Sequence, residues 1–211
     1  MTALDDRTPL TVAITGATGA IYGVKILQRL REFDVPTTLI MSPWGRRTIE
    51  HETSFTGAQV EQMATSVENH RDLGARVSSG SVATRGMVIA PCTMKTVAAI
   101  SHGLGDNLVS RAADVVLKEG RKLLVIARET PLNQVHLENM LRLARMGVIV
   151  MPPVPAFYNH PESIDDMVGY TVDRALDQFG IANPQSRRWT GEMQTSDATQ
   201  DDDGATGTGS N

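Results

Sequence analysis

The chain has 211 residues, of which 41% are hydrophobic, and its formal net charge is −4. This length is typical of one domain with a single hydrophobic core. No apolar run reaches the ~20 residues that a membrane-spanning helix needs, and the polar N-terminus lacks the basic start and apolar core of a secretory signal. Because Cys92 is the only cysteine, no internal disulfide can form, and the sequence predicts a cytoplasmic protein.

The charge of the chain is unevenly distributed. Five acidic residues and no Lys or Arg follow Gly191, so the rest of the chain carries a formal charge of +1. A nearly neutral body gives no electrostatic reason to expect nucleic-acid binding. The tail ends in DDDGATGTGSN and has too little apolar surface to offset its ordering entropy. We therefore expect a flexible N-terminus over 1–9, one folded domain over 10–189 and a disordered acidic tail over 190–211.

Short apolar runs alternate along the chain with helical patterns. In chain order the prediction is a strand over 11–15, a helix over 21–33, a strand over 37–41, helices over 43–52 and 57–66, a strand over 87–90, helices over 93–100 and 108–119, a strand over 123–127, a helix over 133–146, a strand over 148–151 and a helix over 163–179. Ser42 and Pro43 are typical of a helix start, Asp106 is a predicted N-cap, and Gly120 fits a helix C-terminus.

Unbroken apolar strands that alternate with helices are typical of a parallel sheet with helices on both faces, a three-layer α/β/α fold. Ligands of such sheets bind beyond the carboxyl ends of the strands. Four of these ends are polar or rich in glycine, namely Gly16–Thr18, Ser42, Pro91–Thr96 and Arg128–Glu129. The sequence therefore predicts a ligand site at this edge of the sheet.

Two of these segments carry specific chemistry. The glycines of Gly16–Ala20 permit a tight turn and the close approach of a ligand to a helix N-terminus. The spacing of these glycines is not that of a dinucleotide-binding fingerprint. An ordinary strand-to-helix turn without a ligand would have a similar sequence. Thr93, Lys95 and Thr96 place two hydroxyls and an ammonium at a helix start, which suits a phosphate monoester. The alternative is a plain N-cap with a solvated lysine. Cys92 is interpreted as a small buried residue.

Other residue types narrow the function. Arg111 and Lys118 lie seven residues apart on one helix face, while Tyr158 and Arg174 lie in a Pro-rich loop and the last helix. These four residues could bind a second phosphate only if their segments lie close together in the folded protein. Their spacing in the sequence does not show whether they do. The histidines have no metal-ligand spacing and no nucleophile elbow is present, so no metal is expected.

The ordered segments of the chain resemble the flavin prenyltransferase family of the UbiX type. The matching segments are TVAITGATGAIYG (11–23), LIMSPWGRRTIEHET (39–53), SSGS (78–81), GMVIAPCTMKTVAAI (86–100), RAADVVLKEGRKLLVIARETPL (111–132), HLENMLRLARMGVIVMPPVPAFYNHPESIDDMV (136–168) and DRALDQFG (173–180). The SSGS, PCTMKT and FYNHP versions are most similar to the subgroup associated with hydroxyarylic acid decarboxylases.

The resemblance implies a flavodoxin-like, Rossmannoid subunit that assembles into a dodecamer. It implies a metal-independent transfer of dimethylallyl from dimethylallyl phosphate to reduced FMN, which adds a fourth ring across N5 and C6. The product, prenylated FMN, is the cofactor of a partner decarboxylase of the UbiD type.

The resemblance also assigns the site residues. FMN binding falls on Gly16, Ala17, Thr18, Ser42, Thr93, Met94, Lys95, Thr96 and Arg128. The donor phosphate falls on Arg111, Lys118, Tyr158 and Arg174. The catalytic roles fall on Glu52, Glu129 and Thr18. Arg, Lys and Tyr donors stabilise the charge that develops on the leaving phosphate, and a carboxylate such as Glu52 or Glu129 relays the proton lost at C6.

Two alternatives stay open. The first is an FMN-dependent decarboxylase that acts directly on an aromatic or cysteinyl acid; such flavoproteins are expected to carry a catalytic His after the second strand, where His51 is nearby. The second is an FMN carrier without chemistry, against which stand Glu52, Lys118, Glu129 and Arg174, because FMN binding alone needs no second phosphate pocket.

Overall fold

The computed structural model describes residues 7–186 as a six-stranded sheet in the order β3-β2-β1-β4-β5-β6. All neighbouring strands run parallel. The strands are β1 (Leu10–Ile14), β2 (Thr37–Met41), β3 (Ser66–Glu68), β4 (Met87–Cys92), β5 (Leu123–Ala127) and β6 (Ile149–Val150). The expectations for residues 1–6 and for the tail beyond residue 186 lie outside the described residues.

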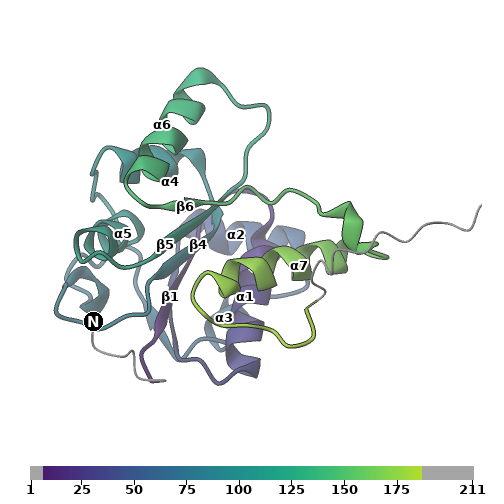
Figure 1. Cartoon of the computed structure of the whole chain (residues 1–211). Helices are drawn as coiled ribbons and strands as arrows, with labels where there is room; N and C mark the ends of the chain where they lie inside the picture. Colours follow the sequence, from purple (N-terminus) through teal and green to yellow (C-terminus); the bar gives the residue numbers. More distant parts are fainter. Residues whose placement is uncertain (1–6, 187–211) are drawn as a thin grey trace, which may run out of the picture.

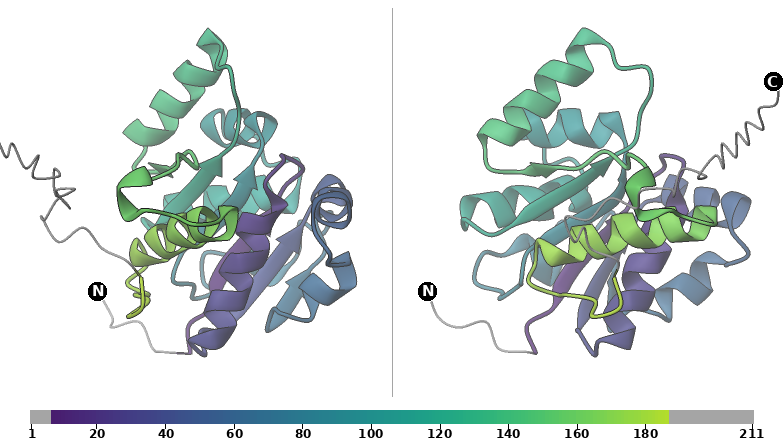
Figure 2. Two further views of the ribbon diagram at one scale, coloured as in Figure 1. Left: turned by 90° about the vertical axis from the view of Figure 1, so that its right-hand side faces the viewer. Right: turned by 45° about the vertical axis from the view of Figure 1, so that its right-hand side comes forward.

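Helices cover both faces of this sheet, as predicted (Figures 1 and 2). The helices are α1 (Ala20–Glu32), α2 (Pro43–Glu52), α3 (Gly57–Glu61), α4 (Met94–Ser101), α5 (Leu108–Lys118), α6 (Gln134–Arg145) and α7 (Ile164–Asp177). Helix α1 packs against α2 and α7, while α4 packs against α5 and α6. The three-layer, flavodoxin-like fold is therefore confirmed.

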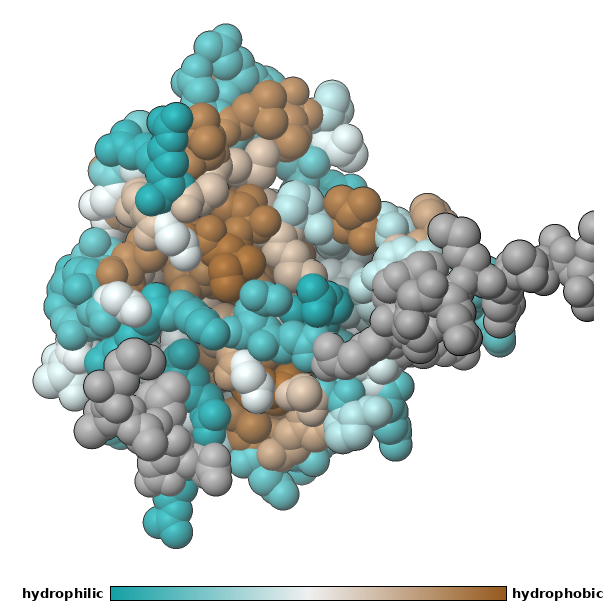
Figure 3. All heavy atoms as spheres, viewed as in Figure 1, coloured by the Kyte–Doolittle hydropathy of each residue, from teal (hydrophilic) through white to brown (hydrophobic). Residues whose placement is uncertain are grey.

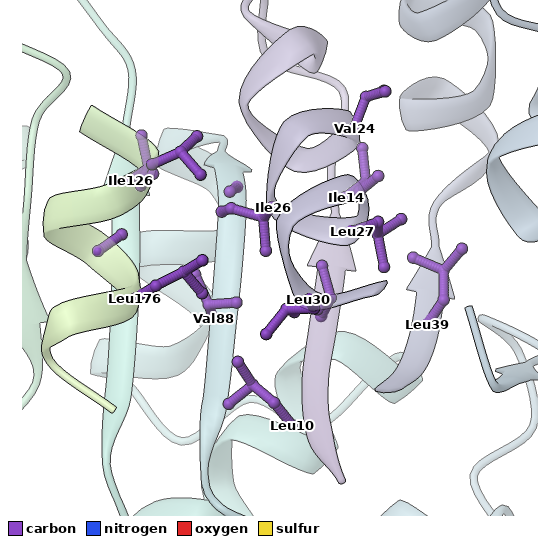
Figure 4. Packing of buried hydrophobic residues seen from close by; sticks show 14 of the residues in the cluster. Leu10, Ile14, Val24, Ile26, Leu27, Leu30, Leu39, Val88, Ile126 and Leu176 are labelled. Carbon is purple, nitrogen blue, oxygen red and sulfur yellow. The ribbon is translucent and has the colours of Figure 1, made fainter. Parts of the chain in front are cut away.

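Alternating strand residues supply two separate cores. Leu10, Val12 and Ile14 of β1 pack with α1 and α7, whereas Ala13 of β1 packs with α4 and α5. Figure 4 shows Leu27 and Leu30 of α1 directed onto the sheet. Each such side chain contributes about 1.5–3 kcal/mol when it is fully buried. The strands are apolar on both sides because helices cover both faces.

Several helix starts follow their sequence signals. Ser42 accepts a hydrogen bond from the amide of Gly45, and Thr93 accepts one from that of Thr96. The predicted cap Asp106 is wrong by one residue, because the Asn107 side chain accepts from the amides of Val109 and Ser110. Asp106 instead accepts a hydrogen bond from the Asn107 amide group at 2.8 Å.

Two predicted elements differ in extent. The helix predicted over 57–66 ends at Glu61, and Ser66–Glu68 pairs with β2 as an edge strand that its polar sequence did not indicate. Strand β4 continues through Pro91 to Cys92, with a register shift after Ile89. Pro91 donates no backbone hydrogen bond, but its carbonyl accepts from the amide and hydroxyl of Thr15. Within residues 7–186, no helix is long and apolar enough to cross a bilayer.

Candidate active site

The order of the strands reverses between β1 and β4, and this is where parallel sheets of this kind bind ligands. The segment Gly16–Thr18 follows β1, and Thr93–Thr96 follows β4. The Thr15 hydroxyl donates to the Pro91 carbonyl at 2.7 Å and accepts from the Thr93 amide at 2.9 Å. These bonds hold the two predicted flavin segments side by side.

A cavity of about 440 Å³ opens between these segments. Its lining includes the predicted residues Gly16, Ser42, Thr93, Lys95 and Thr96. The Thr93 and Thr96 hydroxyls lie 2.9 Å apart at the start of α4. Hydroxyls, an ammonium and a helix N-terminus together suit a phosphate group. The structure therefore brings together in one cavity most of the residues assigned to FMN.

Close backbone contact between the β1–α1 and β2–α2 turns shapes this cavity. A Cβ atom added to Gly16 would lie 2.5 Å from the Cβ of Trp44, and one added to Gly45 would lie 2.5 Å from the Ile14 carbonyl oxygen. Real Cβ atoms do not approach so closely, so a side chain at Gly16 would push the two turns apart. Glycine is required at Gly16 for packing between turns.

Glu52, the predicted catalytic acid, lies at the N-terminus of α1. Its Oε2 accepts hydrogen bonds from the amides of Gly19 at 2.8 Å and Ala20 at 3.0 Å. A carboxylate at this end of a helix is stabilised by the unpaired amides and the helix dipole. The sequence showed no capping signal here, because Glu52 and α1 are far apart in the chain. Glu52 therefore shapes the glycine turn in addition to its predicted role.

Arg128 and Glu129 follow β5 at the same edge. The Arg128 amide donates to the Cys92 carbonyl at 3.3 Å, and its guanidinium lowers the pKa of Tyr22, although burial of the phenol raises that pKa by more. Tyr22 lies on α1 beside Gly19. The Arg128 guanidinium thus lies close enough to Tyr22, beside the glycine turn, to influence its charge. Glu129 is exposed and accepts only from the neighbouring Thr130 amide at 3.1 Å among its described contacts.

Tyr158 and Arg174, assigned to the donor phosphate, lie near each other on the α7 face. Tyr158 hydrogen bonds to Tyr170 of α7, and their rings meet edge-on at 6.2 Å. This hydrogen bond is the main reason why the pKa of Tyr158 is raised, while the Arg174 guanidinium lowers it. Arg174 pairs with Asp177 at 3.1 Å. The Arg174 guanidinium therefore lies close enough to Tyr158 to influence the charge of its phenol.

Arg111 and Lys118, the other half of the donor set, lie elsewhere. Both belong to α5, on the opposite face of the sheet from α7. Arg111 donates to the Ser78 carbonyl at 3.3 Å, and Lys118 pairs with Glu119 beside Gly80. Both residues thus border the SSGS segment from α5. One chain does not bring the four predicted phosphate donors together.

Several residues at the site were not predicted from the sequence. His70, Arg71, Asp106 and Asn107 line the flavin cavity, and Tyr22 lies at the glycine turn. The first two come from a loop that contains no recognisable motif. Asp106 was considered only as a helix cap. Thr18 is exposed at the turn, and Cys92 is buried, which raises the pKa of its thiol well above the ordinary range.

Among the described residues, no cluster of three or more His, Cys, Asp or Glu side chains has metal-ligand geometry. The hydroxyls and the ammonium at the start of α4 are instead consistent with an anionic cofactor. Thr93, Lys95 and Thr96 would hold the phosphate of FMN.

Comparison with known proteins identifies the family. The flavoprotein family model matches residues 2–176. A probable UbiX-like flavin prenyltransferase of Bacillus subtilis (strain 168) is 55% identical over 185 residues, which cover 88% of this chain and 91% of the relative. The flavin prenyltransferase UbiX of Escherichia coli (strain K12) is 50% identical over 185 residues, covering 86% of this chain and 98% of that protein.

Solved structures agree. AnUbiX (PadA1), in complex with FMN and dimethylallyl pyrophosphate, superimposes with a TM-score of 0.87 at 48% identity and covers 89% of this chain and 100% of its own. A dodecameric FMN-dependent UbiX-like decarboxylase from Escherichia coli O157:H7 gives a TM-score of 0.85 at 55% identity, with 86% and 99% covered. The chain therefore belongs to the flavoprotein family and, within it, to the UbiX-like flavin prenyltransferases.

Proposed function

We propose that this protein is a flavin prenyltransferase, a metal-independent transferase that moves dimethylallyl from dimethylallyl phosphate to reduced FMN. The observation that carries the proposal is the phosphate-type cavity at the strand-order reversal, in a chain 48% identical to a protein solved with FMN and dimethylallyl pyrophosphate. The product is prenylated FMN, which a decarboxylase of the UbiD type uses as its cofactor.

The overall reaction breaks the bond between the allylic carbon and the phosphate oxygen, and phosphate leaves with the electron pair. N5 of reduced FMN forms the first bond to the allylic carbon and loses its proton. The C=C bond of the prenyl group then takes up one proton while its other carbon bonds to C6, and C6 loses a proton, so the flavin gains C5H8 overall. We assign Arg111, Lys118, Tyr158 and Arg174 to the leaving phosphate, because donors in a water-poor site stabilise its growing charge. These donors take the place of the metal ion that stabilises the leaving group in pyrophosphate-dependent prenyltransferases.

Proton transfer is assigned to the carboxylates. Glu52 is anchored by the amides of Gly19 and Ala20 through one oxygen, which leaves its other oxygen to receive or relay a proton near the turn. Glu129 follows Arg128 at the same sheet edge and is the second candidate. Thr18 adds a hydroxyl at the exposed tip of the turn.

The cofactor assignment uses the cavity and the glycine turn. Gly16, Ala17 and Thr18 border FMN from β1, and Ser42 borders it from β2. The Thr93–Thr96 segment, which includes Met94, binds its phosphate, and Arg128 binds the flavin from β5. Ser42 and Thr93 are held in place because each also caps its helix.

We further propose that neighbouring subunits complete the donor site. Arg111 and Lys118 lie on the face of the sheet opposite to Tyr158 and Arg174, so a second copy of the chain is needed to bring all four to one phosphate. Figure 3 shows apolar residues gathered on α6 and beside β6. Val135, Leu137 and Leu141 of α6 are 51–61% exposed, as expected of an interface helix. A dodecamer, the state of the solved Escherichia coli O157:H7 relative, is the proposed assembly.

The rival enzyme function is a direct decarboxylase. It draws support from the description of that solved relative as an FMN-dependent decarboxylase. However, curated relatives from Escherichia coli O157:H7 and Bacillus subtilis carry the prenyltransferase name at 53% and 55% identity. His51, the histidine nearest to the expected catalytic position, is exposed on α2 and does not line the flavin cavity. Prenyl transfer therefore fits the site better.

One incubation separates the three functions. The purified protein, reduced FMN and dimethylallyl phosphate are mixed without oxygen, and the flavin is weighed by mass spectrometry. Prenyl transfer predicts a gain of one C5H8 unit and release of inorganic phosphate. Binding of FMN without any mass gain would instead support the carrier, and release of carbon dioxide from a hydroxybenzoate by the protein alone would support the decarboxylase.

The proposed cellular setting is the cytoplasm. Cys92 is buried as a free thiol, which is compatible with a reducing compartment. Neither nucleic acid nor a membrane is proposed as a partner.

A further inference from the structure

Every cation assigned to the donor phosphate has a carboxylate partner in its own chain. The pairs are Arg111 with Asp114 at 3.0 Å, Lys118 with Glu119, and Arg174 with Asp177 at 3.1 Å. Tyr158, the fourth donor, hydrogen bonds to Tyr170 and brings no positive charge. The three positive charges of the donor set are therefore balanced by three negative charges before any phosphate is counted.

The cations assigned to FMN have no such partners. Within residues 7–186, neither the Lys95 ammonium nor the Arg128 guanidinium forms an ion pair with a carboxylate. Exposed ion pairs contribute little to stability, so stability does not explain why carboxylates accompany one set of cations and not the other. The carboxylates coincide with the ligand assignment, which points to a role at the donor site.

A carboxylate beside a phosphate-binding cation acts on the anion through its charge. It repels the anion, and the repulsion grows in proportion to the negative charge that the anion carries. Asp177 is the most shielded of the three carboxylates, because its side chain is 14% exposed, compared with 46% for its partner Arg174. Water and salt therefore screen the Asp177 charge least, while the Arg174 guanidinium keeps an accessible surface that can bind phosphate.

We propose that Asp114, Glu119 and Asp177 make the donor site select a phosphate monoester over a pyrophosphate. The inference rests on the proposed function, which assigns their partner cations to the donor phosphate. At pH 8 a phosphate monoester carries about two negative charges and a pyrophosphate about three, so each carboxylate repels the pyrophosphate more strongly. The three residues act through their charge and through the cations that they hold, which makes them positioning residues rather than catalytic ones.

The test measures how strongly inorganic phosphate and inorganic pyrophosphate compete with dimethylallyl phosphate in the prenyl-transfer assay, at pH 8 with a chelator present to remove divalent cations. In Asp177→Asn, the ratio of the phosphate inhibition constant to the pyrophosphate inhibition constant should rise about threefold to tenfold over the parent, because one negative charge near the anion is lost. A change in the orientation of Arg174 alone would weaken both inhibitors together and cancel in this ratio.

A second variant and a control accompany this measurement. Asp114→Asn should raise the same ratio by about twofold or more. It decides the test if Asp177→Asn melts at a lower temperature than the parent, because the Asp114 side chain is 47% exposed and its replacement leaves no buried group unpaired. Glu32→Gln is the matched control: Glu32 pairs with Arg29 on α1 at 2.7 Å and at the same spacing of three residues, but neither residue is assigned to a ligand.

A ratio that stays at the parent value in either aspartate variant, when that variant is as stable as the parent, would overturn the inference. An equal rise in Glu32→Gln would also overturn it, because the effect would then belong to the charge of the whole protein and not to the donor site. A parent that transfers no prenyl group would give a different result: it would overturn the proposed function, and the inference would fall with it.

Discussion

The flavin cavity and the donor-phosphate residues differ in how much of each a single chain assembles. The cavity is built from backbone turns that follow adjacent strands. The Thr15 hydroxyl holds β1 and β4 together there, because it donates to the Pro91 carbonyl and accepts from the Thr93 amide. The donor residues come in two pairs on opposite faces of the sheet. A fold can fix the first kind of site by strand pairing alone, whereas the second kind depends on contacts between copies of the chain. We call the flavin cavity the flavin half of the site and the four donor-phosphate residues the donor half. Substitutions in one half should therefore impair binding of its own ligand without impairing binding of the other.

Glu52→Gln should break the chemistry while sparing both binding halves. The glutamine oxygen can still accept from the Gly19 and Ala20 amides, but it cannot take a proton. We expect FMN and donor binding within about threefold of the parent and a loss of about 10²–10⁴ in the rate of prenyl transfer, the range for a missing general acid or base. Single-turnover mass spectrometry of the flavin measures this rate. Unchanged turnover would remove Glu52 from the mechanism.

Arg174→Ala should affect only the donor half. We expect FMN to bind as in the parent, while kcat/KM for dimethylallyl phosphate falls by the equivalent of about 2–4 kcal/mol, since a charged partner of the phosphate is lost. Titration of FMN and of the donor into the same preparation separates the two effects. Loss of FMN binding in this variant would show that the two halves are one site.

Gly16→Ala should damage the flavin half. Because the new Cβ would lie 2.5 Å from the Cβ of Trp44, the two turns must separate, at a cost of about 1–3 kcal/mol of stability. We expect weaker FMN binding in the same variant, measured by fluorescence titration. Gly169→Ala is the control: a Cβ added to this glycine of α7 would meet no atom within 4 Å, so this variant should be neutral or more stable by up to about 1 kcal/mol.

Tyr170→Phe should have the smallest effect and appear only at high pH. The hydrogen bond between Tyr158 and Tyr170 is the main cause that raises the pKa of Tyr158. A raised pKa means that the neutral Tyr158 phenol is favoured in the folded protein; this contribution is present below about pH 10 and is lost as the pH rises further. Removing the bond should move the alkaline limb of kcat/KM for the donor to lower pH. An alkaline limb that stays in place would contradict a donor role for Tyr158.

Much of the flavin half could be predicted from the sequence. The apolar runs 37–41 and 123–127 match β2 and β5 residue for residue, because buried parallel strands are apolar on both sides. Once the strands are assigned, the positions of their carboxyl ends and of the hydroxyl-rich start of α4 can be inferred from the sequence. Strand β3 was missed because Ser66–Glu68 is short and polar at the sheet edge.

The rest could not be predicted from local pattern. His70 enters the cavity because its loop is tied to the start of α5, a contact between segments that are distant in the chain. The separation of Lys118 from Arg174 depends on which face of the sheet each helix covers. The spacing of residues in the sequence does not show which face of the sheet a helix covers. The structure of one chain does not show how neighbouring subunits are arranged.

The most direct test of a shared donor site is complementation between two inactive variants. Lys118→Ala and Arg174→Ala are each expected to lose most prenyl transfer, and the two are then expressed together in one cell with different tags and purified as mixed oligomers. If one copy supplies Lys118 and another supplies Arg174 to each donor site, random pairing leaves about a quarter of the sites intact, and the flavin gains its C5H8 unit at about that fraction of the parent rate. Mixed oligomers as inactive as either variant alone would contradict a donor site shared between subunits.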